Sequence, residues 1–140
     1  MSDKHLEIEI VSPQSVLYSG RANAIFVPGA KGPFEILFNH AAIVSSLDPG
    51  IVRVVDESGK EEIFACDSGM VEVHNNHVSV LVSSAVERTH IKHDAARLSL
   101  DATMEKLRAA KSAEEAEALR KTAGFLQAQL KVAEKYPISL

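Results

Sequence analysis

Residues 26–50 read FVPGAKGPFEILFNHAAIVSSLDPG, and this stretch decides how the first half of the chain folds. Pro-Gly pairs stand at 28–29 and 49–50, and Gly32 with Pro33 breaks the run between them. Such residues mark turns, and the apolar runs that they separate are shorter than typical helices. The stretch therefore predicts short strands joined by turns.

The segment GAKGPF at 29–34 has the glycines and the lysine of a phosphate-binding loop but lacks its pattern. A phosphate loop reads G-x-x-x-x-G-K-[ST] and leads into a helix, whose first amides face the phosphate. Here Pro33 removes an amide, no Ser or Thr follows a Gly-Lys pair, and the next residues resemble a strand. We therefore do not expect phosphate binding at this loop.

Strand patterns continue on both sides of the opening stretch. Leu6, Ile8 and Ile10 alternate with glutamates, which is the period of a strand with one solvated face. The loops 56–60 and 74–77 carry the Gly and Asn residues that hairpins favour. We expect an all-β sandwich or closed barrel over residues 1–86. Further strands are predicted at 16–18, before a turn at Ser19-Gly20, and at 24–27, 51–55, 62–65, 70–73 and 78–82.

The composition changes near residue 86. Six of the seven glycines and four of the five prolines lie before residue 70, whereas alanine is dense after residue 90. Ser112 and Glu115 fit a capping box that starts a helix at about residue 113. Residues 87–140 are thus expected to form an antiparallel hairpin of two helices. Their predicted apolar stripes are Ile91, Ala95, Leu98 and Ala102, widened by Leu100, Met104 and Leu107, and then Ala116, Leu119, Ala123, Leu126 and Leu130.

This hairpin is predicted to be an appendage that undocks from the sandwich. Its apolar faces are rich in alanine, so docking buries less apolar area per residue than leucine would. Gly124 costs about 1 kcal/mol relative to alanine inside a helix. It marks either a close helix crossing or a weak point.

Charge and composition exclude several classes of function. The net charge of -4 and the pI of about 5.8 argue against nucleic-acid binding. The single cysteine, Cys66, is interpreted as a buried packing thiol in a reducing compartment. The first ten residues lack the apolar core of a signal peptide, and no stretch approaches the roughly 20 apolar residues that span a bilayer.

The histidines do not form a recognisable reactive site. His90 and His93, with Asp94, are interpreted as solvated residues at a helix start, because no Cys-x-x-Cys or His-Glu-x-x-His pattern accompanies them. His40 lies among apolar residues, but the sequence places no nucleophile or carboxylate beside it. We expect no catalytic residues, no metal site and no cofactor.

The opening stretch also resembles a known family through a pattern close to V-P-G-x-x-G-x-F-G-[VI]-L-x-x-H-A-P, followed by L-x-P-G-x-[VI]-R-[VI]. The matches include Ile10 to Pro13, Tyr18 to Gly20, Ser68 to Val73, Asn76, Val78, Val80 and Leu81. Together they resemble the epsilon subunit of F-type ATP synthases along the whole chain. The residues that match the central pattern are Val27-Pro28-Gly29, Gly32, Phe34, Ile36-Leu37, His40-Ala41, Leu47, Pro49-Gly50 and Val52-Arg53-Val54.

The resemblance implies a non-catalytic rotor component of the central stalk. It would lie at the cytoplasmic face of a bacterial membrane, held there by the complex, against the gamma subunit and the c-ring. It would couple proton-driven rotation to ATP synthesis. The helical hairpin would extend toward the alpha and beta subunits and inhibit ATP hydrolysis. The candidate subunit-interface residues are Pro28, Gly29, Gly32, Phe34, Glu35, Phe38 and His40.

Some positions depart from the family pattern. Glu35 stands where the family usually has glycine, and Ala42 replaces the usual proline. Lys31 and Pro33 stand in the loop where many members carry an acidic residue that faces the rotor ring. These departures concern the charge of the rotor contact.

Some bacterial members bind ATP on the hairpin through a motif like [IL]-D-x-x-R-A. In this chain Asp94 and Arg97 match its spacing, whereas His93 and Leu98 do not match. The segment 124–130 of the second helix has no basic residue to hold phosphates. An i,i+3 ion pair between Asp94 and Arg97 is the favoured interpretation, and ATP as a regulatory ligand is the alternative.

Two other functions stay open from the sequence. The chain is alternatively a free-standing sandwich with a helical hairpin that binds a protein partner as an adaptor. An enzyme that uses His40 as a base is a third hypothesis, and the missing partner residues weaken it.

Overall fold

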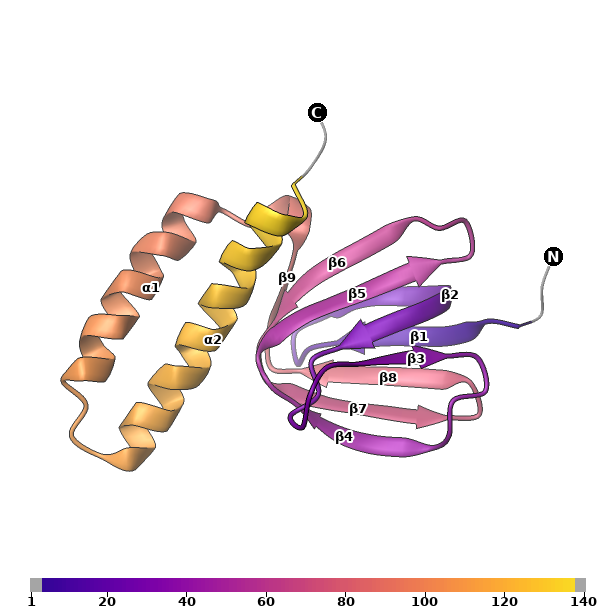
Figure 1. The fold of residues 1–140 in the computed structure, drawn as a ribbon, viewed down its shortest axis with the longest axis horizontal. Coiled ribbons are helices and arrows are strands. Elements are labelled where there is room, and N and C mark those ends of the chain that lie inside the picture. Colours follow the sequence, from indigo (N-terminus) through magenta and orange to yellow (C-terminus); the bar gives the residue numbers. More distant parts are fainter. Residues whose placement is uncertain (1–3, 138–140) are drawn as a thin grey trace.

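The computed structural model describes residues 4–137, which form a β-sandwich followed by a helical hairpin, as the sequence predicts (Figure 1). A short 3₁₀ turn, η1 (Arg88–His90), leads from the last strand to the two helices, α1 (His93–Arg108) and α2 (Ala113–Lys135). The strands are β1 (Leu6–Val11), β2 (Val16–Val27), β3 (Phe34–Leu37), β4 (Ile43–Leu47), β5 (Gly50–Asp56), β6 (Glu61–Cys66), β7 (Gly69–His74), β8 (His77–Val82) and β9 (Ala85–Glu87).

The strands follow the order β4-β7-β8-β1-β2-β5-β6-β9, with β3 added beside β2. All neighbours pair antiparallel except β1 and β8. The first half of β2 pairs with β1, and its second half pairs with β3 and β5. Strand β2 therefore passes from one layer of the sandwich to the other.

The turn expected at Ser19-Gly20 is wrong. Strand β2 runs through both residues without a break, and Gly20 pairs with Ile8 of β1. The alternating apolar residues of β1 supply a partner for the whole first half of β2, and this pairing overrides the local preference of Ser-Gly for a turn. The two predicted strands, 16–18 and 24–27, are thus parts of one.

The two hairpin loops behave as the sequence predicts. In the loop between β7 and β8, Asn75 and Asn76 have φ angles of 47° and 62°, the left-handed region that asparagine tolerates. In the loop between β5 and β6, Gly59 has a φ of 87°. Inward-facing residues of the two layers then form one core between the sheets, with Leu6, Ile10 and Ile25 fully buried.

Strand β6 is buried on both faces, and this joins the hairpin to the sandwich. Phe64 and Cys66 face the sandwich core, whereas the alternate residues Ile63 and Ala65 face α2. The continuous apolar run IFAC at 63–66 indicates burial on both faces, because a strand with one solvated face alternates apolar and polar residues. From α2, Ala128 and Val132 are buried against it, and Ile51, Ile91, Phe125 and Tyr136 pack around the contact.

Helix α2 begins at Ala113, as the capping box predicts. The Ser112 hydroxyl accepts a hydrogen bond from the Glu115 amide at 3.0 Å, and the Glu115 carboxylate accepts one from the Lys111 amide at 3.2 Å. The stripe predicted for α1 is partly wrong. Its buried residues are Ala96, Leu100 and Thr103, whereas Leu98 is 71% exposed and Ala95 and Ala102 are also exposed. Leu98 and Leu100 are two residues apart and therefore lie on different faces of α1. Leu100 lies on the face that packs against α2.

Gly124 marks a close approach, although to the sandwich and not to the other helix. A Cβ atom added there would lie 3.1 Å from Cβ of Pro49, in the turn before β5. The absence of a side chain thus allows α2 to lie directly on this turn.

We predict that Gly124→Val weakens the docking of the hairpin. The larger side chain would overlap Pro49, and overpacking of this kind costs about 1–3 kcal/mol. Amide exchange of α2 should accelerate, while exchange in β1 and β8 stays slow. Ala118→Val, at an exposed position of the same helix, is the control for helix propensity. Equal exchange in the two variants would contradict the prediction.

Candidate functional site

The seven candidate interface residues lie along one edge of the sandwich. Strand β3 pairs with β2 on one side and forms this edge, and the loops before and after it carry the remaining candidates. Phe34 packs against the core, whereas Glu35 is exposed on the outer face. We call this set the β3 edge; it comprises Pro28, Gly29, Gly32, Phe34, Glu35, Phe38 and His40.

The loop before β3 is held firmly by its backbone. Pro28 and Ala30 are tied to the end of β4 by hydrogen bonds, from the Asp48 amide to the Pro28 carbonyl at 3.0 Å and from the Ala30 amide to the Ser46 carbonyl at 2.9 Å. A Cβ on Gly29 would lie 2.6 Å from the Gly32 carbonyl oxygen. Gly32 itself has a φ of 131°, which glycine favours. Both glycines therefore shape the loop.

His40 lies in the loop after β3, beside a polar clamp. Its Nδ1 is 2.8 Å from the Ala41 carbonyl oxygen, and its ring is 6.3 Å from that of Phe34. Next to it, two hydrogen bonds join Asn39 and Asn76. The Asn39 backbone N–H donates to Asn76 Oδ1 at 2.6 Å, and Asn76 Nδ2 donates to Asn39 Oδ1 at 3.2 Å. This clamp fixes the loop to the β7–β8 hairpin, so His40 is positioned by packing and backbone contacts.

The structure also shows an exposed apolar patch that the sequence analysis missed. Val44, Met70 and Leu81 are 64%, 38% and 41% exposed on the outer face of β4, β7 and β8. In the strand register Met70 lies between Ser46 of β4 and Leu81 of β8, whereas Val44 pairs with Glu72, two residues further along β7. We call these three residues the outer apolar patch. Beside it lies a hollow of about 620 Å³ lined by Met70, Leu81, Val11, Pro13 and several serines.

The pattern of β7 and β8 contains a signal for this patch. In MVEVH and VSVLV the inward positions are valines, so Met70 and Leu81 occupy outward positions that polar residues would normally fill. Apolar residues gathered on an outer sheet face are typical of a protein contact.

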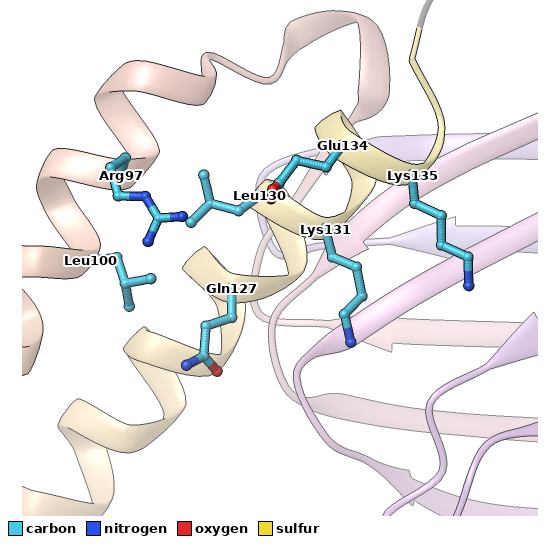
Figure 2. Close-up of a pocket in the computed structure, with 7 residues that line it drawn as sticks. All are labelled: Arg97, Leu100, Gln127, Leu130, Lys131, Glu134 and Lys135. Carbon is cyan, nitrogen blue, oxygen red and sulfur yellow. The ribbon is translucent and has the colours of Figure 1, made fainter.

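A basic groove lies between the two helices (Figure 2). Its volume is about 490 Å³, and Arg97 of α1 reaches it from one side. Lys131 and Lys135 of α2 line it together with Glu134, so the basic residues missing from 124–130 follow directly after that segment. The i,i+4 spacing of these lysines could have revealed them.

The predicted ion pair between Asp94 and Arg97 is wrong. The Asp94 carboxylate is fully exposed and lies 3.4 Å from Nδ1 of the neighbouring His93. Arg97 points instead into the basic groove. The structure thus separates the two residues that matched the nucleotide motif.

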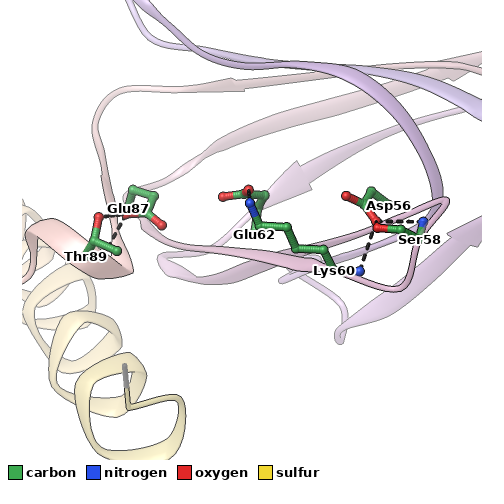
Figure 3. A network of polar contacts seen from close by, with 6 residues as sticks. All are labelled: Asp56, Ser58, Lys60, Glu62, Glu87 and Thr89. Atoms are coloured by element: carbon green, nitrogen blue, oxygen red, sulfur yellow. Dashed lines mark hydrogen bonds and ion pairs between the residues drawn. The ribbon is translucent and has the colours of Figure 1, made fainter. Parts of the chain in front are cut away.

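Figure 3 shows three polar contacts: one in the β5–β6 turn, one at the start of β6 and one between β9 and η1. The Asp56 carboxylate accepts hydrogen bonds from the Ser58 hydroxyl at 2.7 Å and from the Ser58 and Lys60 amides at 2.9 Å. These bonds lower the pKa of Asp56, the hydroxyl contributing most. Lys60 then lies 3.4 Å from Glu62, and Glu87 caps η1 through the Thr89 amide at 2.8 Å.

Partly buried Tyr18 and buried Cys66 have raised pKa values. Burial raises the pKa of Tyr18, and the carboxylates of Asp56 and Glu62 add to the effect. Burial likewise raises the pKa of the Cys66 thiol to about 12, with Asp67 adding to it. Cys66 is therefore a protonated packing group at neutral pH, which confirms its interpretation as a buried thiol.

Within residues 4–137, no three His, Cys, Asp or Glu side chains lie close enough together to hold a metal ion. The same residues include no helix with the length and apolar character needed to cross a membrane.

Comparisons with known proteins identify the class to which this architecture belongs. Residues 5–88 match the family described as ATP synthase, Delta/Epsilon chain, beta-sandwich domain, which is the part that contains β1 to β9. The chain therefore belongs to the delta/epsilon chain family of ATP synthase, as the opening pattern indicates.

One curated relative is the ATP synthase epsilon chain of Campylobacter lari. It is 37% identical over 81 residues, which cover 58% of this chain and 62% of the relative. The match thus spans less than two thirds of that protein's length.

Two solved structures share the fold of nearly the whole chain. One belongs to the Euglena gracilis mitochondrial ATP synthase, OSCP/F1/c-ring in rotational state 1, with a TM-score of 0.80, 19% identity, and coverage of 94% of this chain and 82% of the other. The second belongs to the central stalk/c-ring of the Tetrahymena thermophila mitochondrial ATP synthase. It has a TM-score of 0.65, 17% identity and coverage of 94% and 98%. Both extend the likeness to the helical hairpin.

We predict a pH-dependent effect of Asp56→Asn. The pKa of Asp56 in the folded state lies below the ordinary 3.8, so the ionised carboxylate stabilises the β5–β6 turn above that pH. This stabilisation is lost as the pH falls through the lowered pKa. In urea unfolding, the variant should be less stable than the parent at pH 7, and this difference should shrink as the pH falls below 3.8.

The exposed Glu57→Gln removes a charge from the same turn and is the control. A deficit of Asp56→Asn that stays constant across this pH range would contradict the prediction.

Proposed function

We propose that the chain is a non-catalytic subunit of the central stalk of an F-type ATP synthase, which couples rotation to ATP synthesis. The observation that carries this proposal is the family match of the sandwich. The fold shared with stalk and c-ring assemblies supports it. In this role the chain would bind at the cytoplasmic face of a bacterial membrane through the complex.

The outer apolar patch is the surface best suited to the gamma subunit. Its three residues lie on a rigid sheet, and a stable interface needs an apolar centre of this kind. The β3 edge would meet the c-ring, and its backbone-anchored loop presents Lys31 to solvent. The two surfaces share the end of β4, so one body could contact both partners.

We also propose that the hairpin regulates ATP hydrolysis by leaving the sandwich. The small contact area between the hairpin and the sandwich supports this proposal. Ala128 and Val132 of α2 pack on Ile63 and Ala65 of β6. Gly124 of α2 adds a close approach to Pro49. Once released, the helices could extend along the stalk toward the alpha and beta subunits.

Nucleotide binding remains the less favoured alternative for the hairpin. Arg97, Lys131 and Lys135 offer cations for phosphates, but Asp94 lies away from them. Calorimetric titration with ATP tests it, and saturable binding in the millimolar range or tighter would favour it.

We predict that Val44→Lys weakens binding to the gamma subunit about tenfold or more, because an ammonium group would be buried in the outer apolar patch. Val16→Lys is a matched control, since both valines are 64% exposed and lie on different parts of the sandwich. Co-purification and titration with gamma measure the effect. Equal weakening by both changes, or by neither, would count against this surface.

We predict that locking the hairpin changes the activity of the assembled complex. Pro49→Cys with Gly124→Cys places two Cβ atoms 3.1 Å apart, so a small outward shift of α2 brings them to the roughly 3.5–4.5 Å of a disulfide. ATP hydrolysis should be faster with the disulfide formed than after reduction, because a docked hairpin cannot inhibit. Identical rates would remove the inhibitory role and leave the coupling role standing.

A further inference from the structure

A second hollow lies where the sandwich meets α2, and we call it the proline pocket. Pro28, Pro33 and Pro49 form one wall, and Gly124, Gln127 and Lys131 of α2 form the other. Its volume is about 360 Å³, which suits a small molecule. Phe26 and Ile51 complete an apolar interior.

Two polar side chains on the helix wall have no partner in the described part of the chain. Among residues 4–137, neither the side-chain amide of Gln127 nor the ammonium group of Lys131 makes a hydrogen bond or an ion pair. Figure 2 shows both side chains leaving α2 on the same side. Glu134 lies one turn along the helix, yet it does not pair with Lys131. A donor pair is therefore available at the edge of an apolar hollow.

The lining defines the chemistry of a ligand. Lys131 is the one charged residue that lines the described pocket, so a single negative charge balances it. The proline and phenylalanine walls suit a flat apolar body. The basic groove shares Gln127 and Lys131 with this pocket but adds the charges of Arg97, Lys135 and Glu134, so its lining is more highly charged.

We propose that the proline pocket binds a small monocarboxylate with an aromatic or short aliphatic body. Its carboxylate accepts hydrogen bonds from Lys131 and Gln127, and its body lies against the prolines. Such a ligand touches the sandwich and the hairpin together, so it binds the docked form and stabilises it by mass action. This binding does not depend on the role of the chain in an ATP synthase.

The probe is 3-phenylpropionate, and its neutral amide is the comparison ligand. Titration of the full chain, followed by amide NMR shifts, should show saturable changes centred on Gly50, Ile51, Gly124 and Ala128. The carboxylate should bind about tenfold more tightly than the amide, the factor that corresponds to 1.4 kcal/mol. It should also slow amide exchange throughout α2.

Lys131→Met should remove the preference for the carboxylate while the fold is retained, and Lys131→Arg should restore part of it. Lys121→Met removes an exposed lysine from the same helix and should leave binding unchanged. The proposal is overturned by shifts centred on Arg97 and Lys135, by equal binding of the acid and the amide, or by no saturation at millimolar ligand. If the amide spectrum of Lys131→Met shows unfolding, Lys131→Gln replaces it under the same criteria.

Discussion

The burial of β6 on both faces is the contact on which the arrangement of the chain depends. Phe64 and Cys66 complete the core between the sheets, and Ile63 and Ala65 seat α2 on the outside. The raised pKa of the Cys66 thiol reflects the same burial. Because alternate residues of one short strand serve the two contacts, a change in the strand affects the sandwich and the position of the hairpin together.

The hairpin contact is smaller than the sandwich core and depends on fit. Its centre is made of Ala128 and Val132, and Gly124 lies against Pro49 without a side chain between them. Small residues permit close approach but bury little apolar area, so the docked state is stabilised modestly. The proline pocket lies at this joint, where a bound molecule would have the greatest effect on docking.

Much of the fold could be predicted from local patterns, and the errors have a common cause. The two hairpin loops and the capping box at Ser112 depend on neighbouring residues, and both predictions are confirmed. The turn at Gly20 and the exposure of Leu98 depend on β1 and α2, which sequence periodicity does not place. The candidate site shows the same limit. Met70 and Leu81 form a patch only through the pairing of β7 with β8, whereas the glycines at 29 and 32, which belong to the family pattern, mainly shape a loop.

The path of β2 has a mechanical consequence. One continuous strand of 12 residues belongs to both sheets, so the covalent backbone links the layers in addition to their side chains. A sandwich whose layers meet through side chains alone can shear when its two sides are pulled in opposite directions. Here such a load would stretch peptide bonds and ladder hydrogen bonds before it slid one layer over the other. In the proposed stalk, this stiffness would let the body transmit torque between partners held on different surfaces.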